Sequence, residues 1–308
     1  MDKKELLQLL QRVEFLAGGS RLRRFLEKPV SYFASIFHRK FIFPFRKLPW
    51  RTTCITFWGK KMHILLPAST DIFLTGGKSH DSEIRLAKLI IRQLGVAGTF
   101  IDIGTHYGYF SLLAHQVVGP QGKVYSFEAS PGNYAILKLN AKECPGMETY
   151  HSVVSNEKGE CTFYEFPNLY SEYNTLDISQ FKNESWLKHH PPKMHKLPCL
   201  RLGDFFFENN VKPDFIKIDV EGAEFLVVKG MEAFLRKENP MLVLEFLSAA
   251  RGNENHLQAL HWLSGLGYHP FAIHSNGDLT PIKDVVQYLQ VNQIDSDNIV
   301  FRKEQTNH

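Results

Sequence analysis

Long apolar runs, paired cysteines and a secretion signal are all missing from this 308-residue sequence. No apolar stretch approaches the roughly 20 residues that cross a bilayer. The first residues mix acids with bases and lack a continuous apolar segment, so we expect no standard secretion signal and a cytoplasmic protein. The four cysteines, which form no CxxC pair, argue against a zinc site and against a disulfide framework: Cys54, Cys144, Cys161 and Cys199.

Acidic residues are almost absent from one segment of the chain. Residues 20–62 hold eleven Lys or Arg and a single acid, Glu27. This segment alone therefore has a net charge of +10, whereas the whole chain has +4. Aromatic residues alternate with the bases. Such a segment is typical of peripheral contact with an anionic membrane, here the inner face, but also of an extension whose Phe residues pack on the core. Nucleic acid is the less favoured partner.

Short apolar strands alternate with helical patterns from about residue 79 onward. Strands are expected at 99–103, 123–127, 148–154, 215–218 and 241–246, and helices at 81–94, 109–118, 131–142, 223–236 and 256–266. This alternation predicts an α/β fold with a mostly parallel sheet and helices on both faces. Two further strands, at 268–273 and 298–302, are expected to close the sheet with an antiparallel edge pair, which makes seven strands.

The sequence divides into two regions. Residues 1–78 are predicted to be a basic, aromatic-rich extension with a helix at 5–16 and two strands at 52–58 and 61–66. Pro29, Pro44 and Pro49 should break any long helix there. Residues 79–308 form the main domain, with an insertion at about 160–213 that starts with an extra strand at 161–166 and continues as a loop over the acceptor.

A strand that ends in an acid, followed by a glycine turn and a helix, is the first motif. Asp102 ends the strand, and Gly104 and Gly108 bracket the turn. Glycine lets the backbone approach a ligand closely, and the start of the helix offers free N–H groups. His106 and Tyr107 occupy the turn where a dinucleotide fingerprint needs room for a pyrophosphate, which disfavours an NAD-binding oxidoreductase.

Carboxylates follow three further strands. Glu128 ends the second strand, beside the first turn, where it can accept hydrogen bonds from both ribose hydroxyls of an adenosyl group. Asp219 and Glu221 follow the fourth strand, and Glu245 lies near the end of the fifth. A carboxylate there can orient a donor, take a proton from an acceptor hydroxyl, or hold Mg²⁺ with water. Asp219 is the first candidate for this role and Glu245 the second.

The segments DIGTHYGYFSLLA, VYSFEASPGNY and DFIKIDVEGAEFLVVKG followed by PMLVLEF resemble the FkbM family of S-adenosylmethionine-dependent methyltransferases. The resemblance covers about residues 80 to 247 and implies a Rossmann-like class I methyltransferase fold over 79–308. It also implies S-adenosylmethionine as donor and a hydroxyl on a sugar, glycan or natural product as acceptor.

The donor-binding residues expected from the motifs and the resemblance are Asp102, Gly104, Thr105, His106, Gly108, Phe110, Glu128, Asn133, Ser155 and Asp219. The expected catalytic candidates are Asp219, Glu221, His106 and Glu245. No residue is assigned to a metal. His106 stands where the family usually has Asn, so it either contacts the donor or, as a histidine that titrates near neutrality, acts as a base.

A third class of function is a non-catalytic adenosyl-binding or membrane-docking protein. It would keep the fold without turnover. The paired acids Asp219 and Glu221 disfavour it, because a binding module has no need of an acid cluster at that strand end. We therefore expect an enzyme with a small-molecule or glycan acceptor.

Overall fold

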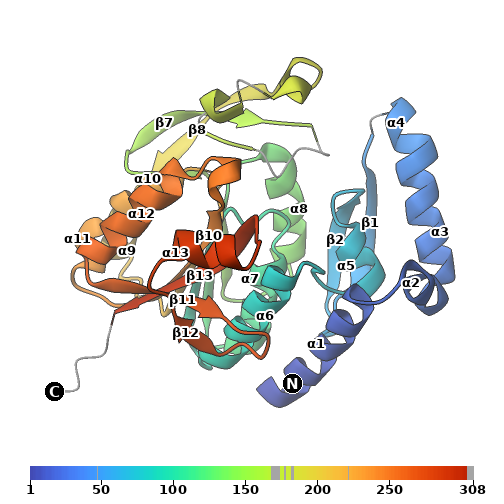
Figure 1. The fold of residues 1–308 in the computed structure, drawn as a ribbon, viewed down its shortest axis with the longest axis horizontal. Helices are drawn as coiled ribbons and strands as arrows, with labels where there is room; N and C mark the ends of the chain where they lie inside the picture. Colours follow the sequence, from blue (N-terminus) through green and yellow to red (C-terminus); the bar gives the residue numbers. More distant parts are fainter. Residues whose placement is uncertain (47, 168–173, 177, 182–183, 221, 304–308) are drawn as a thin grey trace.

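The structure is a computed structural model that describes residues 1–46, 48–167, 174–176, 178–181, 184–220 and 222–303. A central sheet carries helices on both faces, and a helical arm stands at the side of the molecule (Figure 1). In the described residues the sheet has eight strands in the order β12-β11-β13-β10-β9-β3-β4-β5. Their bounds are β3 (Thr99–Ile103), β4 (Lys123–Glu128), β5 (Met147–His151), β9 (Phe215–Ile218), β10 (Met241–Leu247), β11 (Tyr268–Ile273), β12 (Leu279–Pro281) and β13 (Ser296–Lys303).

The path of the chain creates a switch point in the middle of this sheet. The chain starts at β3, moves outward through β4 and β5, and returns to β9 on the other side of β3. All neighbours from β5 to β10 pair in parallel, whereas β13, β11 and β12 add antiparallel pairs. Open parallel sheets bind ligands where the strand order reverses, outside the carboxyl ends of the strands.

The predicted Rossmann-like sheet is confirmed, but with eight strands rather than seven. The additional strand, β12, pairs with β11 at the edge of the sheet. It contains only Leu279, Thr280 and Pro281, which is too short for a two-residue periodicity to show in the sequence.

Successive residues of the central strands point to opposite faces of the sheet and pack in two separate hydrophobic cores. On β3, Phe100 packs under one layer of helices, while Ile101 and Ile103 pack under the other. The first layer is α6 (Asp81–Gln93), α7 (Tyr109–Val118) and α8 (Pro131–Ala141), and the second is α9 (Leu202–Glu208), α10 (Glu224–Gly230), α11 (Glu232–Leu235), α12 (Glu254–Gly265) and α13 (Val285–Val291). Because both faces are buried, these strands are continuous apolar runs in the sequence.

Two predicted elements are split in the structure. The helix expected over 223–236 is interrupted at Met231 between α10 and α11. The strand expected over 148–154 divides into β5 and β6 (Val153–Val154), because β6 leaves the large sheet to pair with β8 (Lys193–Leu200).

The insertion is a small sheet rather than only a loop. β7 (Gly159–Glu165) pairs antiparallel with β8, and this sheet stands above the main body in Figure 1. The extra strand predicted at 161–166 is confirmed as part of β7, whereas β8 and α9 were not predicted. Short helical turns complete the described residues: η3 (Ile178–Phe181), η4 (Ser185–Lys188) and η5 (Ala249–Arg251).

The N-terminal region shares a core with the main domain. Leu6, Leu10 and Val13 of α1 (Lys3–Ala17) are buried in the same cluster as α6. The hairpin of β1 (Trp50–Ile55) and β2 (Lys61–Leu66) adds Met62 and Ile64 to it. The predicted helix and the strand predicted at 61–66 are confirmed, whereas the strand predicted at 52–58 begins at Trp50 and ends at Ile55. α5 (Thr70–Thr75) leads from them into the main domain.

A helical arm lies between α1 and β1, where the prolines were expected to break any long helix; Pro29 does separate two helices, whereas the run over 29–46 continues through Pro44. It consists of α2 (Arg21–Glu27), α3 (Pro29–Phe37), the π-helical turn η1 (His38–Ile42) and α4 (Phe43–Arg46). Pro29 takes the first position of α3, where a missing N–H costs nothing. Pro44 lies inside the helical run. The wide i→i+5 turn just before it loosens the backbone with which a proline ring would otherwise clash.

Candidate active site

The turn after β3 lies directly against the end of β9. Gly104 has a φ of +73°, and a Cβ at this position would lie 1.6 Å from the carbonyl oxygen of Asp219. Only glycine fits such a contact. Gly108, with a φ of +87°, starts α7, and His106 between the two glycines has a φ of 54°. The glycines thus fix the turn so that the two halves of the sheet meet at the switch point.

A cavity of about 550 Å³ lies at this switch point, within the size range of small-molecule sites. Its wall combines the ends of β3, β4, β9, β10 and β13 with parts of the insertion and of residues 68–83. Of the site residues predicted from the sequence, the following line it: Gly104, His106, Phe110, Glu128, Asn133, Asp219 and Glu245.

The other predicted residues lie behind the wall or outside the described part. Asp102 is fully buried, and its Oδ2 accepts hydrogen bonds from Thr105 Oγ1 at 2.9 Å and Ser111 Oγ at 2.6 Å, so it holds the turn together. Gly108 shapes the start of α7, and Ser155 packs against α10. Glu221 lies outside the described residues.

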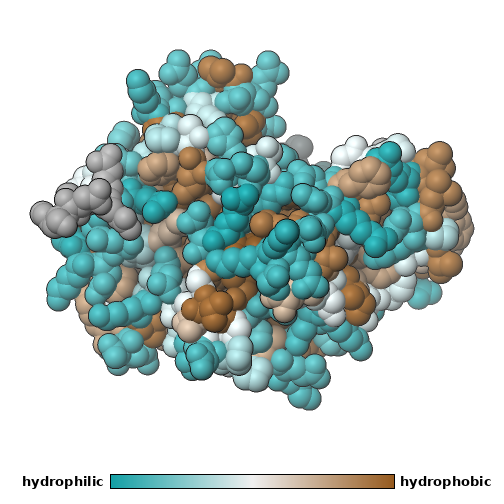
Figure 2. Space-filling view, turned by 90° about the horizontal axis from the view of Figure 1, so that it is seen from below, coloured by the Kyte–Doolittle hydropathy of each residue, from teal (hydrophilic) through white to brown (hydrophobic). Residues whose placement is uncertain are grey.

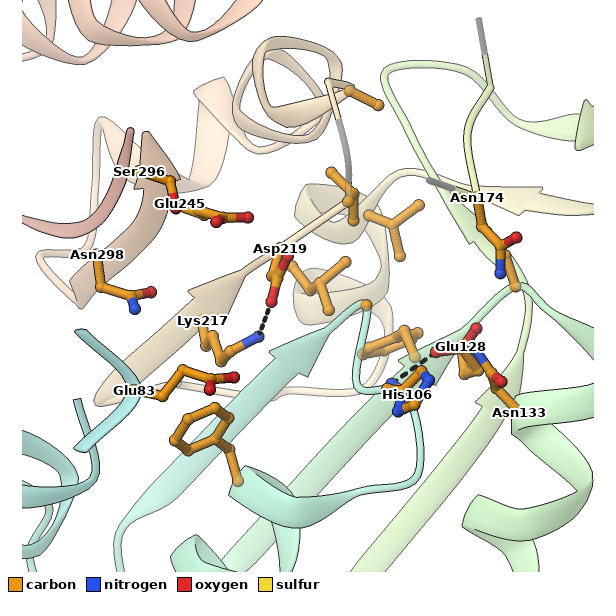
Figure 3. A pocket seen from close by; sticks show the side chains of 18 of the residues that line it. Glu83, His106, Glu128, Asn133, Asn174, Lys217, Asp219, Glu245, Ser296 and Asn298 are labelled. Atoms are coloured by element: carbon orange, nitrogen blue, oxygen red, sulfur yellow. Dashed lines mark hydrogen bonds and ion pairs between the residues drawn. The ribbon is translucent and has the colours of Figure 1, made fainter. Parts of the chain in front are cut away.

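One end of the cavity is built around Glu128 (Figure 3). Its Oε2 accepts a hydrogen bond from the backbone N–H of His106 at 2.7 Å, and its Oε1 accepts one from the N–H of Ser130 at 2.8 Å. Burial raises the pKa of Glu128 to about 8 despite these bonds. The side chain of Asn133 lies beside Glu128 and is a third hydrogen-bond partner that lowers this pKa. A carboxylate has about four lone-pair sites, so accepting capacity for a ligand remains.

His106 is neutral at ordinary pH. Burial and the nearby charge of Lys78 lower the pKa of its imidazole to about 3, with Asp219 only partly opposing them. This pKa disfavours the alternative in which His106 titrates near neutrality and acts as a base, and the other alternative, contact with the donor, stays a prediction.

An ion pair occupies the middle of the cavity. Lys217 Nζ lies 2.9 Å from Asp219 Oδ2 and 3.7 Å from Asp102 Oδ1. Burial alone would raise the pKa of Asp219, but Lys217 and Lys78 more than offset it and hold this pKa below its usual value. An acid this well paired accepts a proton poorly.

Glu245 lies at the far end of the cavity, near Ser296 and Asn298 of β13 (Figure 3). Burial and then the charge of Asp219 raise its pKa to about 8. Its environment is therefore the opposite of that of Asp219, and two neighbouring carboxyls with separated pKa values suit different roles.

Sequence reasoning missed a charged group on the wall formed by residues 68–83. Lys78 Nζ pairs with Glu83 Oε1 at 2.7 Å, and Asp71 also lines the cavity. Burial lowers the pKa of Lys78, but Glu83 and Asp71 together raise it above its usual value. No strand-end motif marks these residues, since they precede the main sheet in the sequence.

Within the described ranges, no group of three or more His, Cys, Asp or Glu side chains is placed to hold a metal ion. The Mg²⁺ option thus has no supporting ligand set there. Over the same part of the chain, no helix has the length and apolar character that crossing a membrane requires.

A family model described as the methyltransferase FkbM domain matches residues 102–270, which is more than half of the chain. The chain belongs to this family. The FkbM match begins at Asp102 and ends before β13, so it includes Gly104, Glu128, Asp219 and Glu245 of the cavity. The wall residues 68–83 and the residues of β13 lie outside it.

Similar proteins are distant. Methyltransferase 1 of Beauveria bassiana (strain ARSEF 2860) is 26% identical over 144 residues, which cover 43% of this chain and 57% of that protein. The chain thus matches less than two thirds of the length of this relative. Among solved structures, fibrillarin from Aeropyrum pernix with natively bound S-adenosyl-L-methionine is 12% identical, covering 71% of this chain and 74% of that chain with a TM-score of 0.40. The O-methyltransferase from Bacillus cereus in complex with SAH is 13% identical, covering 71% and 80% with a TM-score of 0.38.

Proposed function

We propose that the cavity binds S-adenosylmethionine and that the enzyme methylates a hydroxyl group on a sugar, glycan or natural product. The observation that carries the proposal is Glu128, a buried carboxyl beside the Gly104 turn of an FkbM methyltransferase domain. Both of its oxygens are already held by backbone N–H groups, and the carboxylate keeps accepting capacity for the ribose hydroxyls of the donor.

The charges along the cavity fit the rest of this donor. A methionyl carboxylate needs a cation, and Lys78 lies near enough to the Gly104 turn to depress the pKa of His106. A sulfonium favours acidic surroundings, which Asp219 and Glu83 supply. A dinucleotide fits less well, because His106 and Tyr107 fill the turn that a pyrophosphate would approach.

When bound, S-adenosylmethionine supplies an activated methyl group for in-line displacement. The chain holds the acceptor in line, and such positioning is worth about 7–11 kcal/mol. Glu245 receives the hydroxyl proton, because a base works best when its pKa lies near the working pH. Asp219, fixed by Lys217, orients the reacting groups. Sequence reasoning ranked Asp219 above Glu245 as the base, and the two pKa shifts support the opposite order that we propose.

The acceptor class is tested by methyl transfer from labelled S-adenosylmethionine to a panel of sugars, glycans, hydroxylated natural products, RNA and protein. We expect label on a hydroxyl oxygen of one of the first three classes, located by mass spectrometry. Transfer only to RNA or protein would contradict the acceptor class while leaving the donor assignment intact.

Above pH 8, where the Glu128 carboxyl is ionised, Glu128→Gln is expected to weaken S-adenosylhomocysteine binding by about 10–100-fold, because hydrogen bonds to a charged group contribute roughly 1.5–3 kcal/mol. Titration calorimetry measures the loss. Glu148→Gln, an exposed strand acid outside the cavity, is the matched control and should bind like the wild type. Equal affinities of the Glu128 variant and the wild type would show that Glu128 does not contact the ribose.

Lys78→Met is expected to weaken S-adenosylmethionine binding about tenfold and to leave binding of the decarboxylated donor unchanged. The difference arises because only the full donor carries the carboxylate that Lys78 would pair with. Thermal unfolding shows separately how much the Lys78–Glu83 pair contributes to stability. A similar loss for both donors would mean that Lys78 shapes the site without contacting the carboxylate.

A further inference from the structure

A row of large apolar side chains faces solvent along the helical arm. Val30, Phe33, Phe37, Phe41 and Phe45 are 81%, 68%, 46%, 60% and 82% exposed. Figure 2 shows apolar residues gathered at the edge of the molecule that the arm occupies in Figure 1. Folded monomers rarely expose a continuous apolar patch unless it contacts something.

The helix geometry keeps these rings on one side. A four-residue step overshoots an α-helical turn by about 40°, so a long ladder of this spacing would drift around an α-helix. The π-helical turn η1 advances less per residue and offsets that drift. The ring centroids of Phe33 and Phe37 lie 6.1 Å apart, and those of Phe37 and Phe41 lie 5.2 Å apart.

The opposite side of the arm is packed on the protein. Ser35, His38 and Phe43 are buried, and the His38 ring lies 5.8 Å from that of Trp50 on β1. Lys28 Nζ donates a hydrogen bond to the carbonyl of Phe73 on α5 at 3.3 Å. The exposed face is therefore the outer surface of an anchored element. The expectation that the Phe residues of this segment pack on the core fails for Phe33, Phe37, Phe41 and Phe45, which are exposed.

Basic residues lie along the same arm without acids to neutralise them. Arg39, Lys40 and Arg46 are exposed and alternate with the Phe residues. The single acid of residues 20–62, Glu27, is paired with Arg12 of α1. The outer surface of the arm therefore combines exposed aromatic rings with a net positive charge.

We propose that the arm, residues 21–46, docks on an anionic lipid surface. Aromatic and aliphatic side chains on a helix enter the boundary between headgroups and acyl chains, while Lys and Arg contact lipid phosphates. A second copy of the chain is the poorer partner, because a symmetric contact would place two such positive surfaces against each other. This proposal does not depend on the identity of the methyl donor or acceptor.

The experiment compares flotation of the full chain with vesicles of phosphatidylcholine alone and of phosphatidylcholine with phosphatidylglycerol. Two arm variants are used, Phe33→Ser/Phe41→Ser/Phe45→Ser and Arg39→Gln/Lys40→Gln/Arg46→Gln. Matched controls away from the arm are Val96→Ser/Val291→Ser and Lys196→Gln/Lys212→Gln, which change residues that are also well exposed. All substituted side chains are on the surface, and thermal unfolding verifies that each variant is folded.

We expect binding to anionic vesicles that weakens with salt and is absent on neutral vesicles. The charge variant should lose on the order of 100-fold in partitioning, since each base contributes about 1 kcal/mol at such a surface. The aromatic variant should lose at least about tenfold, and both controls should bind like the wild type. Equal binding of all variants, no vesicle binding, or self-association that the aromatic variant abolishes in sedimentation would overturn the proposal. RNA binding by the arm in place of vesicle binding would do the same.

Discussion

Glu245→Gln is expected to lower kcat by about 10²–10⁴-fold, the usual contribution of a positioned general base. Binding of S-adenosylhomocysteine should stay within about threefold of the wild type, because Glu245 lies at the end of the cavity away from Glu128 (Figure 3). Single-turnover kinetics and calorimetry measure the two quantities. An unchanged kcat would exclude Glu245 as the base.

The pH dependence separates Glu245 from Asp219. A base must be deprotonated, so kcat of the wild type at saturating substrates should rise about tenfold per pH unit below about 8 and level off above it. Asp219→Asn removes a charge that raises the pKa of Glu245. This variant should therefore reduce kcat and also shift the rising limb of the pH profile of kcat to lower pH. Glu245→Gln should abolish the limb. A limb that survives in Glu245→Gln and disappears in Asp219→Asn would restore Asp219 as the base.

Gly104→Ala is expected to lower the free energy of unfolding by at least about 4 kcal/mol or to prevent folding. A Cβ would meet the carbonyl oxygen of Asp219 at 1.6 Å, so β3 and β9 would have to separate at the switch point. The positive φ of +73° adds backbone strain of about 1–2 kcal/mol. Urea denaturation measures the change.

Gly267→Ala is the matched control for Gly104→Ala. Gly267 has a φ of +85° and nothing within 4 Å of its would-be Cβ, so only the backbone strain applies. We expect a loss of about 1–2 kcal/mol. If both variants lose the same amount, the close approach of the two strands makes no contribution to stability.

Most strands of the sheet could be predicted from the sequence, because each one is marked by a local pattern of apolar residues. The apolar runs at β3, β4, β9 and β10 are buried on both faces, and their strand-end residues Glu128 and Asp219 line one cavity. Parallel strands place their carboxyl ends at the same edge, so the sequence order alone brings such residues together.

The rest of the site depends on contacts that no local pattern reveals. Lys78 lies just before α6 and Glu83 in its first turn, and only the packing of α6 against the sheet brings them into the cavity wall. The ranking of Asp219 above Glu245 rested on their positions at strand ends, which carry no information about their pKa values. Their pKa values move in opposite directions because Lys217 pairs with one carboxyl while burial dominates the other.

The measurement that tests the central claim most directly is calorimetric titration of the full chain with S-adenosylmethionine, S-adenosylhomocysteine and NAD. We predict micromolar binding of both adenosyl ligands with one site per chain, and no binding of NAD. Binding of NAD without either adenosyl ligand would contradict the assignment of the cavity at Glu128 to a methyl donor.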